Sequence, residues 1–482
     1  PPLNLLYFTG WFVNYLLTPA APAALLPTLK PLNFGATGLW SGIAIALLYV
    51  TNRWVNVNKI SLHNFYRDRL SRAYLIQSHS PLADNAAPVD RVEPKDRIFL
   101  SSLYEGSRNA GPYPIINTNL NLTKQVPDVR QDGVFRNCES FMFSKYWCGS
   151  KETGYIATTT YEKEDKHFDL AAAMAISGAA ANVGMGHGNA PATRLLMGLL
   201  NVRLGYWAPN PGRSFGLASR LLLGNTPGGL LAMSEWIGRY TAKGDFINLS
   251  DGGHFDNLGV YELLRRRCKY IIVGDAEADP KMQFQALAYI IRLARIDFGV
   301  EIEIDTARLK PDKETGLSHQ HCTVGIVNYP RCGQAGAEQG YLLYCKSCLS
   351  GDEPEHLHEY RVTHPAFPHQ TTADQWFDER QFEVYRELGF HVGNTTFKPV
   401  IRTMKRTTTE DLFISTKEFW QPRSLASKNK FTQHARELNR IMEIIKSDAN
   451  LAFMDDQLFP EWKTFMSGVT RTDPPNLWLP FT

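Results

Sequence analysis

An aspartate followed by two glycines, Asp251-Gly252-Gly253, is the part of this sequence whose residue types and order point most directly to chemistry. The surrounding pattern predicts a strand, a turn, a helix and a second strand, at Phe246–Leu249, Ser250–Gly253, Leu258–Arg267 and Tyr270–Val273. This order is typical of the βαβ unit of a parallel sheet, and open α/β folds place their chemistry at the carboxyl edge of such a sheet. Because glycines allow a sharp turn, we expect the Asp251 carboxylate to lie at this edge and to act as a general base. The alternative is a structural aspartate that caps the turn.

Two serines are candidates for the nucleophile that such a base would activate, Ser177 and Ser214. Ser177 lies in Ala-Ile-Ser-Gly-Ala, which differs from a Gly-x-Ser-x-Gly elbow in both outer glycines, and the run before it favours a helix. Ser214 lies in a literal Gly-Arg-Ser-Phe-Gly match. Pro209 and Pro211 precede that match, and we interpret it as a surface loop because prolines do not suit the buried strand of an elbow.

No metal site or cofactor is predicted from the other polar residues. Four acids near the same predicted sheet edge are interpreted as helix caps and solvated turns rather than as ligands of a divalent ion: Asp256, Asp275, Glu277 and Asp279. The segment 351–369 carries four histidines without metal-ligand spacing, and we expect a loop there. The seven cysteines are scattered, which predicts thiols in a reducing compartment.

The first fifty residues carry almost no charge, Lys30 being the exception. Two apolar runs, Leu3–Leu17 and Gly35–Val50, have aromatic residues at or near their ends, which favours membrane insertion over a pair of buried core helices. A basic flank follows, and it predicts that the large domain lies on the cytoplasmic side. Its residues, set against the single acid Asp68, are Arg53, Lys59, Arg67, Arg69 and Arg72.

Helical spacing in Asn58–Leu75 predicts an amphipathic connecting helix, and the polar, proline-bearing Gln77–Lys95 marks a boundary. We therefore expect membrane-associated helices and a basic connecting helix in residues 1–76, and an α/β domain with a C-terminal helical extension in residues 77–482. Within that domain Gly111–Leu122 is predicted as a strand and Asp132–Thr160 as irregular chain. Further helices are expected at Met282–Ile296, Thr372–Leu388 and Phe431–Lys446, and further strands at Val300–Ile304, Cys322–Tyr329 and Gly340–Lys346.

The composition is that of an ordinary folded protein, with 44% hydrophobic and 21% charged residues over 482 positions. The net charge of +3 is too small to indicate a nucleic-acid partner.

The long block around Asp251, SDGGHFDNLGVYELLRRRCKYIIVGDAEAD, resembles the Asp-Gly-Gly block of patatin-like phospholipases, and more narrowly their large membrane-associated branch. Other stretches that resemble this branch are NKISLHNFYRDRLSRAYL, GPYPIINTNLNL, AMAISGAAANVGMG, LGYWAPNP and FPHQTTADQWFDERQFEVYRELGFHVG. The resemblance implies a three-layer α/β/α domain with a mostly parallel central sheet. It also implies hydrolysis of lipid acyl esters by a Ser–Asp dyad, in which Asp251 is the base and Gly252 and Gly253 form its turn.

The chain departs from that family in one respect, because the glycine-rich oxyanion loop and the serine elbow, expected upstream, are missing. In the branch the Ala-Ile-Ser-Gly-Ala stretch is not the nucleophile. The nucleophile is therefore expected before Pro1 or on a companion fragment; alternatively the protein is a catalytically silent, membrane-anchored subunit of a larger complex, or Ser177 or Ser214 serves after all. The expected partners are a membrane lipid, a phospholipid or another acyl ester, and a companion fragment or partner subunits.

Overall fold

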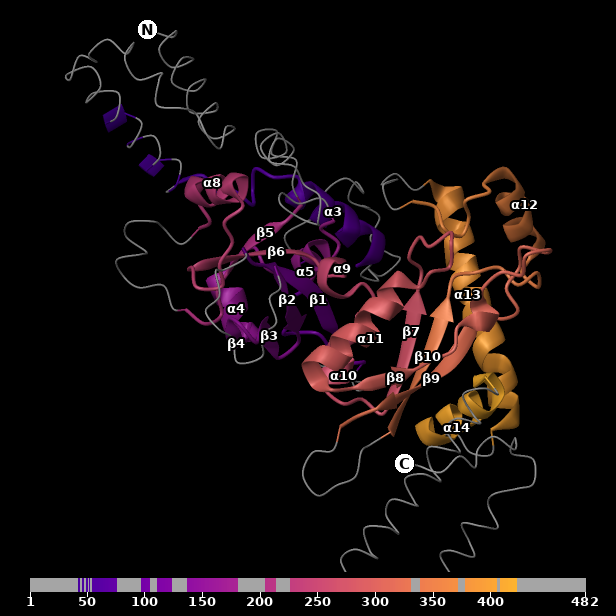
Figure 1. Cartoon of the computed structure of the whole chain (residues 1–482). Helices are drawn as coiled ribbons and strands as arrows, with labels where there is room; N and C mark the ends of the chain where they lie inside the picture. The colour runs from indigo at the N-terminus through magenta and orange to yellow at the C-terminus, as the bar shows by residue number, and fades with distance from the viewer. Residues whose placement is uncertain are drawn as a thin grey trace, which may run out of the picture. The chain divides into compact units, whose positions relative to one another are not determined.

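The structure is a computed structural model of the 482-residue chain. It describes residues 42–43, 46, 49–50, 52, 54–75, 97–104, 111–123, 137–180, 204–213, 226–330, 339–371, 378–404 and 408–422. The chain divides into two compact units, Pro1–Phe255 and Asp256–Thr482 (Figure 1).

The first unit is built on a six-stranded sheet in the order β4-β3-β2-β1-β6-β5, and every pairing recorded in it is antiparallel. Its strands are β1 (Ile115–Asn121), β2 (Cys138–Ser144), β3 (Trp147–Ser150), β4 (Gly154–Ala157), β5 (Tyr206–Pro209) and β6 (Phe246–Asp251). Aromatic and aliphatic side chains of one sheet face form the core, among them Leu120, Phe141, Phe143, Ile247 and Leu249.

Helix α5 (Leu170–Ser177) covers this apolar face. Its sequence is rich in alanine, and Ala172, Ala173 and Ile176 are buried in the same core as the sheet residues, so the helix backbone can approach the strands closely. The helix begins at the Asp169 side chain, which accepts a hydrogen bond from the Ala172 amide at 2.8 Å. Gly178 follows its last residue, Ser177, and α5 therefore ends beside the carboxyl end of β6, the strand that carries Asp251.

Helix α3 (His63–Tyr74) packs against α5 with its polar face. Arg67 donates hydrogen bonds to both carboxylate oxygens of Asp169, the capping residue of α5, and His63 Nδ1 lies 2.9 Å from the Leu204 carbonyl oxygen. The apolar side chains point outward instead, and Phe65 is 53% exposed. The predicted helix is present, but its apolar face is the solvent-facing one.

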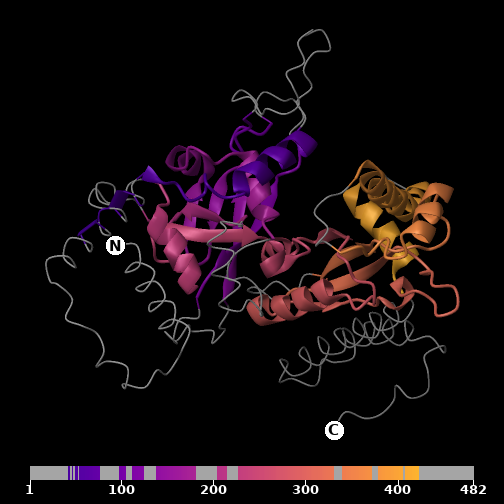
Figure 2. The same cartoon turned by 90° about the horizontal axis from the view of Figure 1, so that it is seen from above.

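The second unit contains a four-stranded sheet in the order β7-β10-β9-β8. Its strands are β7 (Tyr270–Asp275), β8 (Glu301–Glu303), β9 (Cys322–Asn328) and β10 (Gln339–Lys346); β7 and β10 are parallel, and the other pairs are antiparallel. Helix α11 (Gln285–Phe298) lies on one face, and α13 (Glu379–Thr403) and α14 (Thr409–Trp420) lie on the other (Figure 2). The short helices α10 (Tyr261–Arg265) and α12 (Glu355–Thr363) and a single 3-10 turn, Ala307–Leu309, also belong to this unit.

The expectation of a mostly parallel central sheet is wrong. Strands β6 and β7, which were predicted to belong to one βαβ unit, lie in different sheets, and the recorded pairings are antiparallel except β7 with β10. A parallel pairing between them would have required the intervening helix to return the chain to the same sheet. Instead the chain enters the second unit at the last residue of the short helix α9 (Gly253–Asp256), and α10 then leads to β7.

The predicted membrane helices are also absent from the part of the chain that the structure describes. Among those residues there is no helix whose length and apolar character would let it cross a bilayer. Leu3–Leu17 lies outside the described residues, as does most of Gly35–Val50. The predicted domain boundary at residues 76 and 77 also lies outside them.

Local predictions fared better than sheet pairing. The strands expected at Gly111–Leu122, Cys322–Tyr329 and Gly340–Lys346 are confirmed as β1, β9 and β10, and the helix expected at Met282–Ile296 as α11. Three local predictions are wrong. The loop expected over residues 351–369 contains the helix α12. The segment predicted as irregular, Asp132–Thr160, contains β2, β3 and β4. The prolines before the Gly-Arg-Ser-Phe-Gly match were expected to exclude a buried strand, but Pro209 is the last residue of β5, all of whose residues are buried. A proline is tolerated there because β5 lies at the edge of its sheet.

Candidate functional site at the end of strand β6

Asp251 is the last residue of β6 and lies opposite Thr118 of β1. Its Oδ1 accepts a hydrogen bond of 2.7 Å from the Gly253 amide, and α9 begins at that same glycine. The side chain therefore caps the turn from strand to helix, as the structural interpretation of Asp-Gly-Gly predicts. The second carboxylate oxygen has no part in this cap.

The first glycine of the turn is required by a close approach of two backbone segments. A β-carbon at Gly252 would lie 2.4 Å from the Asn117 carbonyl oxygen, which is far inside van der Waals contact. The Gly252 amide donates to the Ser177 carbonyl oxygen at 3.1 Å, and the Asp251 amide donates to the Ala179 carbonyl oxygen at 3.3 Å. The turn is thus fixed between β1 and the end of α5.

The environment of Asp251 raises the pKa of its carboxyl group. The main cause is partial burial, which disfavours the charged form, and the Gly253 amide and His254 oppose it. In the described part of the chain Asp251 forms no salt bridge with lysine or arginine. A half-buried carboxylate that keeps some basicity and is not neutralised by a fixed cation is the kind of group that can accept a proton from a hydroxyl.

Besides His254, Tyr66 of α3 is a side chain whose pKa depends on the charge of Asp251. Burial raises the pKa of its hydroxyl, and the negative charge of Asp251 raises it further. The hydroxyl lies against Gly178, because a β-carbon there would be 2.6 Å from the Tyr66 oxygen. The phenol therefore stays neutral and is a potential donor at the edge of the site.

Ser177 lies beside the turn, but its hydroxyl does not engage the carboxylate. It donates to the Asn117 carbonyl oxygen at 2.7 Å, and its own carbonyl accepts from Gly252. The structure thus brings Ser177, Asp251 and Gly252 together through the backbone, with the Ser177 proton directed elsewhere. Ser214, the second predicted serine, lies outside the described residues.

The four acids predicted to be caps and turns have different roles. Asp256 and Asp279 cap backbone amides: Asp256 accepts from Leu258 and Tyr261, and Asp279 accepts from Gln283 and Phe284. Glu277 accepts hydrogen bonds from Asn257 and Ala286. Asp275 departs from the prediction, because it is buried and forms a 2.8 Å ion pair with Lys346, whose side chain is also fully buried.

A second cluster of polar side chains, in the second unit, was missed by the sequence analysis. It consists of His321, Asp352, Glu353 and His391, whose possible ligand atoms lie within 4.8 Å of one another. These residues come from three separate segments, so no local spacing signals them. The histidines that were considered lie in or around α12, in the segment predicted as a loop, and none of them belongs to this cluster.

Comparison with known proteins adds little to this geometry. No family model matches the chain, and no curated protein sequence matches it. Among solved structures it is similar to human GIVD cytosolic phospholipase A2, with a TM-score of 0.36 and 17% sequence identity. The match covers 67% of this chain and 47% of that one, so the chain spans less than half the length of that protein. A likeness this remote carries no inference about function.

Proposed function

We propose that the chain is part of a lipid acyl-ester hydrolase in which Asp251 accepts the proton of a nucleophilic serine. The observation that carries this proposal is the state of the Asp251 carboxylate. It is half-buried, its pKa is raised by burial, and one of its oxygens is held by the Gly253 amide while no described lysine or arginine neutralises it. This combination supports a base that is oriented by the backbone and still reactive.

The nucleophile is proposed to come from outside the described residues, in another part of the protein or in a companion fragment. Ser177 is a poor donor to Asp251 in this arrangement, because its hydroxyl proton is already directed to the Asn117 carbonyl oxygen. The incoming serine would place its hydroxyl within about 3 Å of the free carboxylate oxygen. Attack on an ester carbonyl would then transfer the serine proton to Asp251, which passes it to the alcohol oxygen as the ester C–O bond breaks, so that the alcohol leaves and an acyl-serine remains. In the second step Asp251 would take a proton from water, the hydroxide would attack the acyl-serine, and the fatty acid would leave as the serine regains its proton.

The outward face of α3 supports a lipid as the substrate. Phe65 and the basic Arg69 are exposed on the helix, and Lys59, Ile60 and Leu62 are exposed in the turn that leads into it. Exposed apolar side chains next to basic ones fit the boundary of an anionic lipid surface, such as the cytoplasmic leaflet. The same helix carries Tyr66, whose ionisation responds to the charge of Asp251. A lipid that lies against α3 would therefore be close to the carboxylate.

A catalytically silent structural subunit is the second candidate, and one observation favours it. The Gly253 amide donates to Asp251, so the side chain already has a role in capping α9. In that case the carboxylate is needed only as a hydrogen-bond acceptor, and asparagine would replace it without loss.

A serine-directed fluorophosphonate probe applied to the protein as isolated from its source distinguishes the two candidates. For a hydrolase we expect one serine to be labelled, and we expect Asp251→Asn to lower the labelling rate by about 100-fold or more. Asp245→Asn, which changes a half-buried acid of the same unit, serves as the control and should be labelled at the wild-type rate. Absence of labelling in the wild-type protein would contradict the hydrolase and support the structural subunit. Equal labelling rates in the wild type and Asp251→Asn would do the same.

A further inference from the structure

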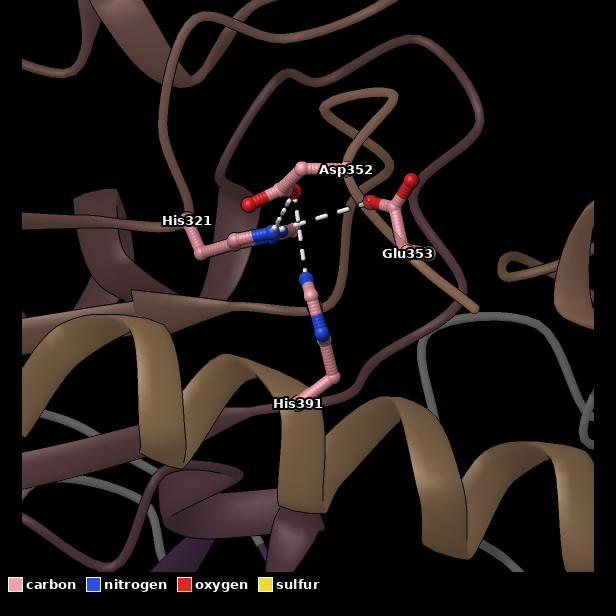
Figure 3. Close-up of side chains that lie close together, drawn as sticks. All are labelled: His321, Asp352, Glu353 and His391. Atoms are coloured by element: carbon pink, nitrogen blue, oxygen red, sulfur yellow. Dashed lines mark hydrogen bonds and ion pairs between the residues drawn. The ribbon is translucent and has the colours of Figure 1, made fainter. Parts of the chain in front are cut away.

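The cluster of His321, Asp352, Glu353 and His391 is assembled by the tertiary fold of the second unit. His321 immediately precedes β9, Asp352 and Glu353 lie between β10 and α12, and His391 lies in α13 (Figure 3). Figure 3 shows the His321 and His391 rings approaching the two carboxylates from different sides. The side chains thus converge from three segments that are far apart in the sequence.

Three of the distances between the donor atoms are close to those around a single small cation, and all the possible ligand atoms lie within 4.8 Å of one another. His391 Nε2 lies 3.1 Å from Asp352 Oδ1, and His321 Nε2 lies 3.6 Å from both Asp352 Oδ1 and Glu353 Oε1. Ligands about 2.0–2.1 Å from a tetrahedral zinc ion are about 3.3 Å from one another. Shifts of a few tenths of an ångström would bring these three pairs to that separation.

Three of the four side chains are largely withdrawn from water, and one is open to it. The exposed side-chain fractions are 0% for Glu353, 4% for His321, 13% for His391 and 60% for Asp352. Both oxygens of Glu353 are oriented by backbone amides, Oε1 by Ser350 at 2.5 Å and Oε2 by Gly351 at 2.8 Å. A buried carboxylate is stabilised by a positive partner, and the side chains near Glu353 are imidazoles, whose ring nitrogens can bind a metal ion.

The Ser350 hydroxyl lies among the same donors, 2.7 Å from His321 Nε2 and 2.5 Å from Asp352 Oδ1. A serine next to a histidine also suggests a nucleophile, but two features oppose that interpretation. The other ring nitrogen of His321 faces Cys348 Sγ at 3.6 Å instead of a carboxylate, and the Gly351 amide is already bonded to Glu353. The triad orientation and a free oxyanion donor are thus both missing at this serine.

We propose that His321, Asp352, Glu353 and His391 bind one zinc ion that fastens α13 to the start of β9 and to the loop before α12. Two imidazoles and two carboxylates suit zinc, whereas calcium and magnesium prefer sites made of oxygen ligands. The exposed Asp352 provides the route by which the ion enters. The Cys348 sulfur lies where it can accept from the second nitrogen of His321, which orients a metal-bound imidazole. This site is independent of the proposed chemistry at Asp251.

The test is the zinc content and thermal stability of the full chain, measured by mass spectrometry of the metal and by thermal unfolding. We expect one zinc per chain, a lower Tm after chelation and recovery of the Tm when zinc alone is added back. His391→Gln and Glu353→Gln should each weaken zinc binding by about 100-fold or more and remove the response of the Tm to zinc. His319→Gln, two positions from His321 and exposed, is the matched control and should bind zinc as the wild type does.

His391→Gln or Glu353→Gln could fail to fold, because both residues are largely buried. Asp352→Asn is therefore tested as well, since Asp352 is largely exposed and its substitution should leave the fold intact. Cobalt substituted for zinc should give the intense visible bands of a four-coordinate site in the wild type, and Asp352→Asn should change these bands in a folded protein. A wild type that neither takes up zinc nor changes its Tm on chelation would overturn the proposal and leave a hydrogen-bonded network. Equal zinc affinity in the wild type, His391→Gln and Glu353→Gln would overturn it as well, because the metal would then be bound elsewhere.

Discussion

Asp251 and Asp275 occupy equivalent places in the two units, since each is the last residue of a strand, β6 in the first unit and β7 in the second. Asp275 is buried, forms an ion pair with Lys346, and accepts hydrogen bonds from the Tyr344 hydroxyl and the Glu277 amide. Asp251 is half-buried and accepts from a single described amide, that of Gly253. The same residue type at the same point of a strand is thus structural in the second unit, where its charge is compensated, and in the first unit it has no lysine or arginine partner among the described residues.

Removal of the cation beside Asp275 should have the largest effect on stability. Lys346→Met leaves the Asp275 carboxylate buried without its ion-pair partner, and we expect a loss of about 3–5 kcal/mol in the free energy of unfolding. Urea denaturation measures it. Lys269→Met is the matched control, because Lys269 pairs with Glu410 at the surface and such pairs contribute at most about 1 kcal/mol. Equal losses in the two variants would contradict the structural role assigned to Asp275.

A β-carbon in the Asp251 turn should have the next largest effect. Gly252→Ala would place a methyl group 2.4 Å from the Asn117 carbonyl oxygen, and relief of this clash should cost about 1–3 kcal/mol. The counterpart in β7 is Gly274→Ala, where a β-carbon meets no atom within 4 Å and stability should change by about 0.5 kcal/mol or less. Thermal unfolding of the two variants compares the turns directly, and similar Tm values would show that the close approach at Gly252 is not restrictive.

Two substitutions of Asp251 separate its cap from its charge. Asp251→Ala removes the acceptor of the Gly253 amide and should cost about 1 kcal/mol. Asp251→Asn keeps an acceptor and removes a charge that burial disfavours, so its free energy of unfolding at neutral pH should equal or exceed that of the wild type.

The difference in free energy of unfolding between Asp251→Asn and the wild type should depend on pH, because the pKa of Asp251 is raised in the folded state. Ionisation of the group at neutral pH costs folding free energy, and this cost disappears as the pH falls through the raised pKa and the carboxyl group takes up its proton. The advantage of Asp251→Asn over the wild type should therefore shrink on acidification. Denaturation curves at several pH values check the sign, and an advantage that grows in acid would contradict it.

The smallest effect on stability is expected on the outer face of α3. Phe65→Ser should change the free energy of unfolding by about 0.5 kcal/mol or less, because the ring is already exposed. Binding to vesicles of anionic phospholipid, measured by co-sedimentation, should nevertheless weaken. Phe382→Ser, at a ring of α13 that is similarly exposed, is the control and should bind vesicles as the wild type does. Equal vesicle binding by both variants would remove the support that α3 gives to a lipid substrate.

Local sequence signals located the strand that ends at Asp251, the turn after it and the helix α10, because each depends on residues close together in the chain; the short helix α9 was not predicted. Sheet pairing depends on distant residues, and nothing in the pattern from Phe246 to Val273 indicated that its two strands belong to different sheets. The same limit applies to β5, where the prolines of Trp207–Pro211 argued against a strand until its edge position was known.

The sequence analysis also missed contacts between polar side chains that lie far apart in the chain. The outward apolar face of α3 depends on a partner for Arg67, and that partner, Asp169, lies about a hundred positions away. The zinc ligands proposed here combine His321 with His391, which lie far apart in the chain and come together only in the folded unit. The place of Asp251 at the end of a strand was predicted from local sequence, whereas the lack of a cationic partner among the described residues could be seen only in the folded chain.

Ester hydrolysis by Asp251→Asn is the most direct test of the central claim, which is that this carboxylate is an uncompensated base. The protein as isolated from its source, wild type and variant, would be assayed with phospholipid vesicles at neutral pH, with the Tm of each recorded beside its rate. The account predicts that kcat/KM falls by about 10²–10⁴-fold while the Tm does not fall. Wild-type turnover in Asp251→Asn would contradict it.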